Sequence, residues 1–212
     1  MRKIRLWLLV VCCLLLVVSC SMAELTFYLI DNFESGSTSK WFPFGSIDVS
    51  AVANPLAKAK DLVAESCGSY MLKIKGSASD WYVGGIGTDL MIDASFYKRL
   101  QMDIYGSALG GKLRIELYDE DNGNNQIETD KNWQPLYDDK WAVEIPILGP
   151  GFTRISVPFT AFTLDNPGKG DGIWNPATKN GSSGLTRMQI VFVAKEKTGK
   201  VDVGLDNVLL TY

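Results

Sequence analysis

Short segments in which apolar and polar residues alternate recur along this chain, about every ten residues, and they limit the fold more than any other feature. Alternation at every second residue is the pattern of a β-strand with one face in a core. Glycine, proline and other turn residues separate the segments, and none of them has the period of an amphipathic helix. The clearest segments are 100–105, 112–118, 188–194 and 201–210.

Many short strands, with neither a strand–helix alternation nor a solenoid repeat, predict an all-β fold of two packed sheets. We expect a two-sheet β-sandwich of the jelly-roll type that forms a single domain over residues 27–212. The connector 106–111 is short and rich in glycine, so we expect 100–105 and 112–118 to form a hairpin. Both 29–36 and the closing stretch 201–210 are apolar runs broken by acids, which suggests neighbouring strands that share a cation or a polar network.

Residues 1–19 have the features of an export signal. Basic residues precede a continuous apolar run over 6–18, as in the basic n-region and apolar h-region of a secretory signal peptide. A membrane-spanning helix needs roughly 20 apolar residues, so the run is short for that role. We therefore expect the folded body to lie outside the cytoplasm.

The end of this run resembles the signal box of bacterial lipoproteins, with a small residue directly before Cys20. That resemblance implies cleavage before Cys20, a lipid on its thiol and a short tether over 20–26. Ser21 follows in place of an acid, a pattern similar to that of lipoproteins sent to the outer membrane. Ordinary cleavage after Ala23 and an uncleaved anchor are the alternatives.

Composition excludes several function classes. The chain has no histidine and a net charge of −3, so His-dependent catalytic triads and His-rich zinc sites are absent. The body has no basic cluster, which argues against a nucleic-acid partner. Cys67 is the one cysteine of the body, and we interpret it as a small buried apolar residue because no histidine can activate its thiol.

Three stretches resemble signature segments of carbohydrate-binding modules. They are Leu-Ile-Asp-Asn-Phe-Glu-Ser-Gly at 29–36, Arg-Ile-Ser-Val-Pro-Phe-Thr-Ala-Phe at 154–162, and Gly-Lys-Val-Asp-Val-Gly-Leu-Asp-Asn-Val at 199–208. Together they are similar to the family-eleven modules and to the wider group of galactose-binding-like sandwiches. The resemblance implies a jelly-roll fold strongly and a carbohydrate ligand more weakly, because these motifs are mostly structural.

The same resemblance implies a structural calcium ion beside the opening and closing strands. The matching residues are Asp31, Glu34 and Asp206, whose carboxylates are the hard oxygen ligands that calcium prefers. Alternatively, these acids cap turns or accept backbone hydrogen bonds. The glucan specificity of the family is not implied. The residues that follow the Pro-Phe-x-x-Phe motif, 163–167, include no arginine or tyrosine.

Several outward-facing side chains of the predicted strands suit sugar recognition on a concave sheet face. Carboxylate, guanidinium and amide groups bond to sugar hydroxyls, and aromatic rings stack on the C–H faces of pyranoses. The alternative is a solvated face held by cross-strand salt bridges, such as Arg114 with Asp103. The outward-facing candidates are Gln101, Asp103, Tyr105, Arg114, Glu116, Tyr118 and Gln189.

Aromatic residues near glycine-rich segments are further candidates for stacking on sugar. Trp81 and Tyr82 precede two glycines that indicate a bulge or a close backbone approach. Trp174 lies in a glycine-rich loop near Asp171 and Asn175, where it either contacts ligand or covers the core. The tryptophans that we expect to pack in the core are Trp41, Trp133 and Trp141.

The acidic run 119–128 resembles a calcium loop without matching one, because its glycine falls one place early for an EF-hand. It predicts either a second, exposed calcium site or a polar hairpin loop. Glu116, Asp119 and Asp103 could also supply the carboxylate pair of a glycosidase, but nothing in the sequence fixes their separation, and we predict that the protein is not an enzyme.

The sequence therefore favours a non-catalytic carbohydrate-binding lipoprotein of the bacterial cell envelope. Its expected partners are an oligo- or polysaccharide and, through the lipid at Cys20, the outer membrane. The leading alternative is a structural or assembly protein that uses the same sandwich to contact a protein of the envelope.

Overall fold

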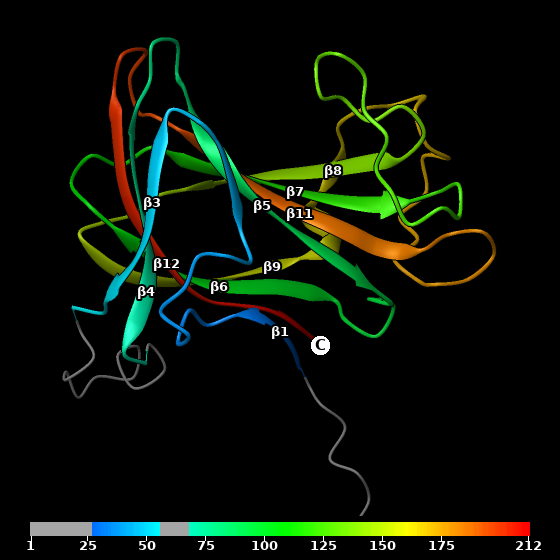
Figure 1. Ribbon diagram of the computed structural model, residues 1–212, viewed down its shortest axis with the longest axis horizontal. Coiled ribbons are helices and arrows are strands. Elements are labelled where there is room, and N and C mark those ends of the chain that lie inside the picture. Colours follow the sequence, from blue (N-terminus) through cyan, green and yellow to red (C-terminus); the bar gives the residue numbers. More distant parts are fainter. Residues whose placement is uncertain (1–26, 56–67) are drawn as a thin grey trace, which may run out of the picture.

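The computed structural model describes residues 27–55 and 68–212 and shows an all-β sandwich, as the alternation predicts (Figure 1). The export signal, Cys20, the tether and Cys67 lie outside the described residues. Within those residues, no helix is long and apolar enough to cross a bilayer. The strands are β1 (Phe27–Asp31), β2 (Phe42–Gly45), β3 (Ile47–Ala53), β4 (Tyr70–Ser77), β5 (Tyr82–Ile92), β6 (Arg99–Gly106), β7 (Lys112–Glu120), β8 (Asp139–Pro146), β9 (Gly151–Pro158), β10 (Thr163–Leu164), β11 (Gly184–Val193) and β12 (Lys200–Thr211).

The strands form two antiparallel sheets. In sheet A the order is β3-β4-β12-β6-β9, and β1 pairs with the second half of β12. In sheet B the order is β10-β8-β7-β11-β5-β2. The pairing of β1 with β12 confirms that the opening and closing strands are neighbours.

The predicted hairpin between β6 and β7 is wrong. β6 lies between β12 and β9 in sheet A, whereas β7 lies between β8 and β11 in sheet B. The glycine-rich connector therefore crosses from one sheet to the other. Each strand has one apolar face. That face packs into the core whether the two strands are neighbours in one sheet or lie in opposite sheets. The alternation pattern alone cannot separate these two arrangements.

The core lies between the sheets and is built from the apolar positions that the alternation marks. Trp41 is buried beside Phe33, with ring centroids 6.1 Å apart, as its predicted packing role requires. Because the apolar face of each strand points inward, the alternate positions of both sheets point outward and form two separate outer faces. The largest inward side chains include Leu72, Ile74, Leu100, Met102 and Ile104 from sheet A, and Ile86, Leu113, Ile115, Leu117 and Phe192 from sheet B.

Candidate ligand-binding face

The candidate binding residues predicted from the strands lie on opposite sides of the sandwich. Arg114, Glu116, Tyr118 and Gln189 face outward from sheet B, where β7 and β11 pair with Glu116 opposite Gln189. The other group, at 101–105, faces outward from sheet A on β6. A single face that contains both groups is therefore excluded, for the same reason that the hairpin is wrong.

On sheet A, Asp103 does not meet Arg114. Its buried carboxylate forms two hydrogen bonds of 2.7 Å with the Arg154 guanidinium and accepts another from the side-chain amide of Asn207. Tyr105 lies beside it, edge-on to Phe152 at 4.9 Å. These contacts fix Asp103 in a structural ion pair, as expected for a carboxylate enclosed within a sheet face.

On sheet B, four predicted residues form a connected set. Arg114 Nε donates to Glu116 Oε1 at 2.8 Å, and the Tyr118 hydroxyl lies 2.9 Å from Glu116 Oε2 and 3.0 Å from Gln189 Oε1. Burial, followed by the negative charge of Glu116, raises the pKa of Tyr118. The tyrosine hydroxyl therefore stays protonated and donates a hydrogen bond within this set.

Two charged residues that the sequence did not single out complete the set. Lys140 Nζ lies 2.9 Å from Asp165 Oδ2 and 3.0 Å from Gln134 Oε1, and Arg114 reaches Asp165 Oδ1 at 2.5 Å. Extending the alternation of 141–145 back by one residue would have placed Lys140 on the outward face. We call Arg114, Glu116, Tyr118, Lys140, Asp165 and Gln189 the polar network.

The polar network is balanced in charge. Two cations, Arg114 and Lys140, face two carboxylates, Glu116 and Asp165. Partial burial alone would raise the pKa of Asp165, but hydrogen bonds from Arg114 and Lys140 outweigh it and hold the pKa below its usual value. Asp165 is thus ionised at neutral pH, and ion pairs hold the network in place.

Aromatic rings border the polar network on the β2 side of sheet B. Phe42 and Phe44 face outward and pair with Gly87 and Gly85 of β5. A Cβ at either glycine would fall 2.3 Å from the facing ring, so the glycines allow the rings to lie directly against β5. Of the two glycines that the sequence marks, Gly84 lies at a break in the β5–β11 register, and a Cβ there would fall 2.5 Å from the Phe44 backbone oxygen, which confirms the bulge and the close backbone approach. Arg187 lies over the Phe42 ring at 5.5 Å, a cation–π contact.

Tyr82, a predicted candidate for stacking on sugar, extends this aromatic border. About half of its surface is exposed (49%), and its hydroxyl lies against Gly45 at the end of β2. Partial burial and then the charge of Glu116 raise its pKa, which agrees with a position on the same outer face. Trp81 is also exposed, but it lies in the turn before β5, where its backbone bonds to Ala194 and Lys197.

Trp133 contradicts the prediction that it packs in the core, because 82% of its surface is exposed. It lies at the tip of a small hairpin closed by the Thr129–Pro135 bridge, with a positive φ of 60°. The next residue, Gln134, contacts Lys140 and so holds this hairpin beside the polar network. A tryptophan in a turn gives no alternation, which is why the sequence did not reveal its exposure.

Trp174 both covers the core and lines a groove. Its ring lies 5.8 Å from Trp141 and 5.1 Å from Phe159, both at the edge of the core. A groove of about 990 Å³ runs past it. Trp141 is half-buried, in agreement with its predicted packing. Other residues that line the groove are Tyr97, Arg99, Phe162, Asn175 and Tyr212.

The predicted calcium ligands near β1 and β12 have protein partners. Asp31 accepts hydrogen bonds from Phe33 N and Trp41 Nε1, both at 2.9 Å. Glu34 accepts from two backbone amides at 69–70. The fully buried Asp206 has its pKa raised to about 8, by burial and then by the charges of nearby acids that include Glu34. Calcium bound by Asp31, Glu34 and Asp206 stays a prediction.

The acids considered for a glycosidase pair do not share a face. Glu116 and Asp119 are three residues apart on β7, so their side chains leave opposite faces about 10 Å apart along the strand. Asp119 instead accepts hydrogen bonds from Trp141 Nε1 and Asn175 N on the inner side, and Asp103 belongs to sheet A. Glycosidase carboxyl groups lie about 5 to 9.5 Å apart around one substrate, an arrangement that these three acids do not form.

Comparison with known proteins supports the fold. No protein-family model matches the sequence, and no curated protein matches it. Similar solved structures include the family 11 carbohydrate-binding module from Clostridium thermocellum in complex with a β-1,3-1,4-mixed-linked tetrasaccharide. It is 18% identical with a TM-score of 0.55, over 87% of this chain and 95% of that one.

Two further solved structures have the same similarity of fold. The family 11 module of a cellulosomal cellulase of the same organism is 18% identical, with a TM-score of 0.54, over 87% of this chain and 94% of that one. An exo-β-agarase is 15% identical, with a TM-score of 0.54, over 87% of this chain and 25% of that one. The chain therefore has the β-sandwich fold of carbohydrate-binding modules.

Proposed function

We propose that this protein binds an oligo- or polysaccharide, without cleaving it, on the outer face of sheet B. The observation that carries the proposal is the combination on one face of an aromatic border and a fixed, charge-balanced polar network. Sugar-binding proteins need both parts, because a pyranose offers hydroxyls at its rim and C–H groups on its faces. The carbohydrate-binding modules that share the fold support the same assignment.

The two parts of this face have separate roles in the proposal. Phe42 and Tyr82 present exposed rings on which sugar units stack. Arg187 and Gln189 lie between these rings and the rest of the network, where they offer donors and an acceptor to hydroxyls. Because the network is already held by its own ion pairs, binding costs little side-chain ordering.

The absence of hydrolysis is part of the proposal. Glu116 is the acid nearest the centre of the face, and it is held by Arg114 and the Tyr118 hydroxyl. A carboxylate whose oxygens are both held in this way is not positioned to protonate a leaving group. A purified sample that cleaves a bound oligosaccharide, with the activity lost in Glu116→Gln, would show that the protein is a glycosidase.

Attachment to the outer membrane through a lipid at Cys20 is also proposed. It rests on the signal-like residues 1–19 and on the small residue before Cys20. Mass spectrometry of the N-terminal peptide from the exported protein tests it. We expect a lipid-modified Cys20, and a soluble Cys20→Ala variant; an unmodified N-terminus after residue 23 would show ordinary cleavage.

A calcium ion near Glu34 and Asp206 belongs to the same proposal. Asp31 ends β1, and Asp206 lies on β12, which pairs with β1. The carboxylate oxygens of these two residues and of Glu34 suit calcium. Asp206→Asn should lower calcium affinity in isothermal titration. Unchanged affinity would assign these acids to the alternative role, in which they hold backbone and side-chain donors.

The face itself is tested with a glycan panel and paired variants. Binding should be saturable and should weaken at least tenfold in Phe42→Ala and Tyr82→Ala. Phe152→Ala is the matched control, because Phe152 is an aromatic residue on the outer face of sheet A. Equal effects of all three substitutions, or no binding to any glycan while an envelope protein co-purifies, would favour the structural or assembly role.

A further inference from the structure

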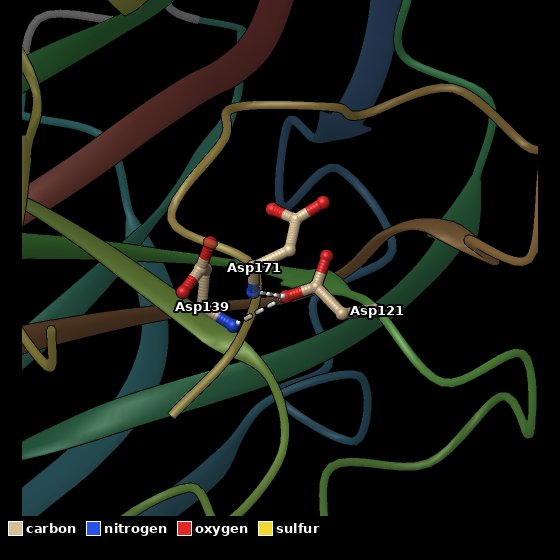
Figure 2. Close-up of side chains that lie close together, drawn as sticks. All are labelled: Asp121, Asp139 and Asp171. Atoms are coloured by element: carbon tan, nitrogen blue, oxygen red, sulfur yellow. Dashed lines mark hydrogen bonds between the residues drawn. The ribbon is translucent and has the colours of Figure 1, made fainter. Parts of the chain in front are cut away.

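Three aspartates from separate segments meet at one end of sheet B. Asp121 follows β7, Asp139 begins β8, and Asp171 lies in the loop between β10 and β11. One carboxylate oxygen of each lies within 4.8 Å of the others (Figure 2). We call these three residues the aspartate cluster. It shares only Asp121 with the acidic run 119–128, so the sequence pattern did not predict the set.

Backbone hydrogen bonds position the cluster. Asp121 Oδ2 accepts from Asp139 N at 3.1 Å and from Asp171 N at 3.4 Å (Figure 2). Asp139 Oδ2 accepts from Gly172 N at 2.7 Å. One oxygen of Asp121 and one of Asp139 are therefore used to join the three segments, which leaves the second oxygen of each available.

The second oxygens are buried and accept no hydrogen bond of good geometry, although the backbone amides of Gly170 and Ile173 lie close to the Asp139 carboxylate. Within residues 27–55 and 68–212, no hydrogen bond reaches Asp121 Oδ1 or Asp139 Oδ1. Asp139 has none of its surface exposed. A Cβ at Gly170 would fall 2.5 Å from Asp139 Oδ1 and 2.1 Å from Asp121 Oδ2, so both carboxylates face the same point. A buried carboxylate oxygen without a partner is costly and indicates a missing ligand.

No basic side chain neutralises the cluster. In the part of the chain that the structure describes, Lys and Arg form no ion pair with any of the three aspartates. Burial, then repulsion by Asp139 and Asp171, raises the pKa of Asp121 to about 6. Burial likewise raises the pKa of Asp139, with a contribution from Asp171. The site thus concentrates negative charge that only a cation from solution can compensate.

A fourth oxygen lies next to the cluster. The Asn175 side-chain amide donates to Asp171 Oδ2 at 3.2 Å, and its carbonyl oxygen is buried without a donor. Asp171 itself is exposed, so water can complete a coordination shell from that side. The available ligands are all oxygens, and three of the four residues carry a formal charge.

We propose that the aspartate cluster binds a calcium ion, with Asp121, Asp139 and Asp171 as carboxylate ligands and Asn175 as a neighbouring oxygen ligand. Calcium–oxygen distances of 2.3–2.6 Å allow ligand atoms of one ion to lie up to about 4.6–5.2 Å apart, and the three carboxylate oxygens, all within 4.8 Å of one another, satisfy this limit. Magnesium, at about 2.0–2.1 Å, requires a tighter octahedron and gives up its water less readily.

The ion would join the loop after β10 to the ends of β7 and β8. The loop carries Trp174, which covers the edge of the core against Trp141. A ligand that binds only the folded state stabilises that state by mass action. For a domain of this size, calcium at 100 times its Kd should raise the melting temperature by about 5–10 °C.

The test uses the full chain, purified in detergent and freed of metal with a chelator. Terbium, a calcium analogue, reports binding by luminescence sensitised through nearby tryptophan, and calcium should displace it. Calorimetry gives the affinity, and 10 mM magnesium should not substitute for calcium. Asp171→Asn is the main variant because the residue is exposed and the amide preserves its shape. Asp80→Asn, from an exposed turn, is the control.

Asp171→Asn should bind calcium at least tenfold more weakly and lose most of the rise in melting temperature. Without calcium it should be at least as stable as the parent chain, because one repelling charge is gone; this result separates lost binding from failed folding. The Asp80→Asn control should keep the terbium signal. Wild-type affinity in Asp171→Asn and Asp121→Asn, loss of the signal in Glu34→Gln alone, or equal stabilisation by magnesium would overturn the proposal.

Discussion

Replacing Lys140 by methionine tests whether the polar network is held by balanced charge. Only 6% of Lys140 is exposed, and its ammonium lies 2.9 Å from Asp165 Oδ2, 3.0 Å from Gln134 Oε1 and 3.9 Å from Glu116 Oε1. Methionine keeps most of the apolar stem and removes the charge. The network would then hold one cation, Arg114, against two carboxylates.

The expected cost follows from the burial of these groups. Removing one partner of a buried ion pair costs about 3–5 kcal/mol, because it leaves an uncompensated charge. The Asp165 side chain is 30% exposed and keeps its contact with Arg114, so we expect a cost below this range, about 2–3 kcal/mol. For a domain of this size the melting temperature should fall by about 4–12 °C.

Urea unfolding followed by tryptophan fluorescence measures this cost. The matched control is Lys112→Met. Lys112 pairs with Glu144 across β7 and β8 on the outer face of sheet B, and about half of each side chain is exposed. This substitution should therefore change the free energy of unfolding by less than about 1 kcal/mol. A double-mutant cycle that combines Lys140→Met with Asp165→Asn should give a coupling energy of at least about 1 kcal/mol. The charge-balance reasoning would be refuted if Lys140→Met lowered the free energy of unfolding by less than about 0.5 kcal/mol. It would also be refuted if the effects of Lys140→Met and Asp165→Asn on this free energy were additive.

Three other predictions concern both outer faces. Arg154→Met should destabilise the protein by about 2–4 kcal/mol in urea, since Asp103 is fully buried, yet it should leave glycan affinity unchanged; a matching loss of affinity would place ligand on sheet A. Gly87→Ala should displace the Phe42 ring and weaken glycan binding more than tenfold in titration, at a cost of about 1 kcal/mol in stability; unchanged affinity would exclude this ring from the site. The pKa of Asp165 is lowered in the folded state, so its stabilising effect is present above the unfolded value of 3.8 and lost as pH falls further. The stability gap between Asp165→Asn and the parent should therefore close in acid, and a constant gap would contradict the ion pairs.

The sequence predicted the fold well because the strands carry their own signal. Alternation over 201–210 identified β12, and the acid-bearing stretch at 29–36 identified its neighbour β1, which the structure pairs with it. Local alternation states which side of a strand is buried. It does not state which strand lies next to it, and so it assigned β6 and β7 to one hairpin although they belong to different sheets.

The candidate site was predicted only in part, for the same reason. Glu116 and Tyr118 were found because they alternate with core residues on β7. Asp165 was missed because it lies in a loop, and its position beside Lys140 depends on the pairing of β10 with β8. The exposure of Trp133 depends on a turn of positive φ, and the aspartate cluster depends on contacts between distant segments. Neither leaves a periodic trace in the sequence.

The most direct test of the proposed function is the affinity of one glycan for the parent chain and for three aromatic variants. The glycan is the best binder from a panel, and titration is followed by tryptophan fluorescence. The proposed function predicts at least a tenfold loss in Phe42→Ala and Tyr82→Ala, with wild-type affinity in Phe152→Ala on the opposite face. Loss in Phe152→Ala with full affinity in the other two would contradict a sugar site on sheet B.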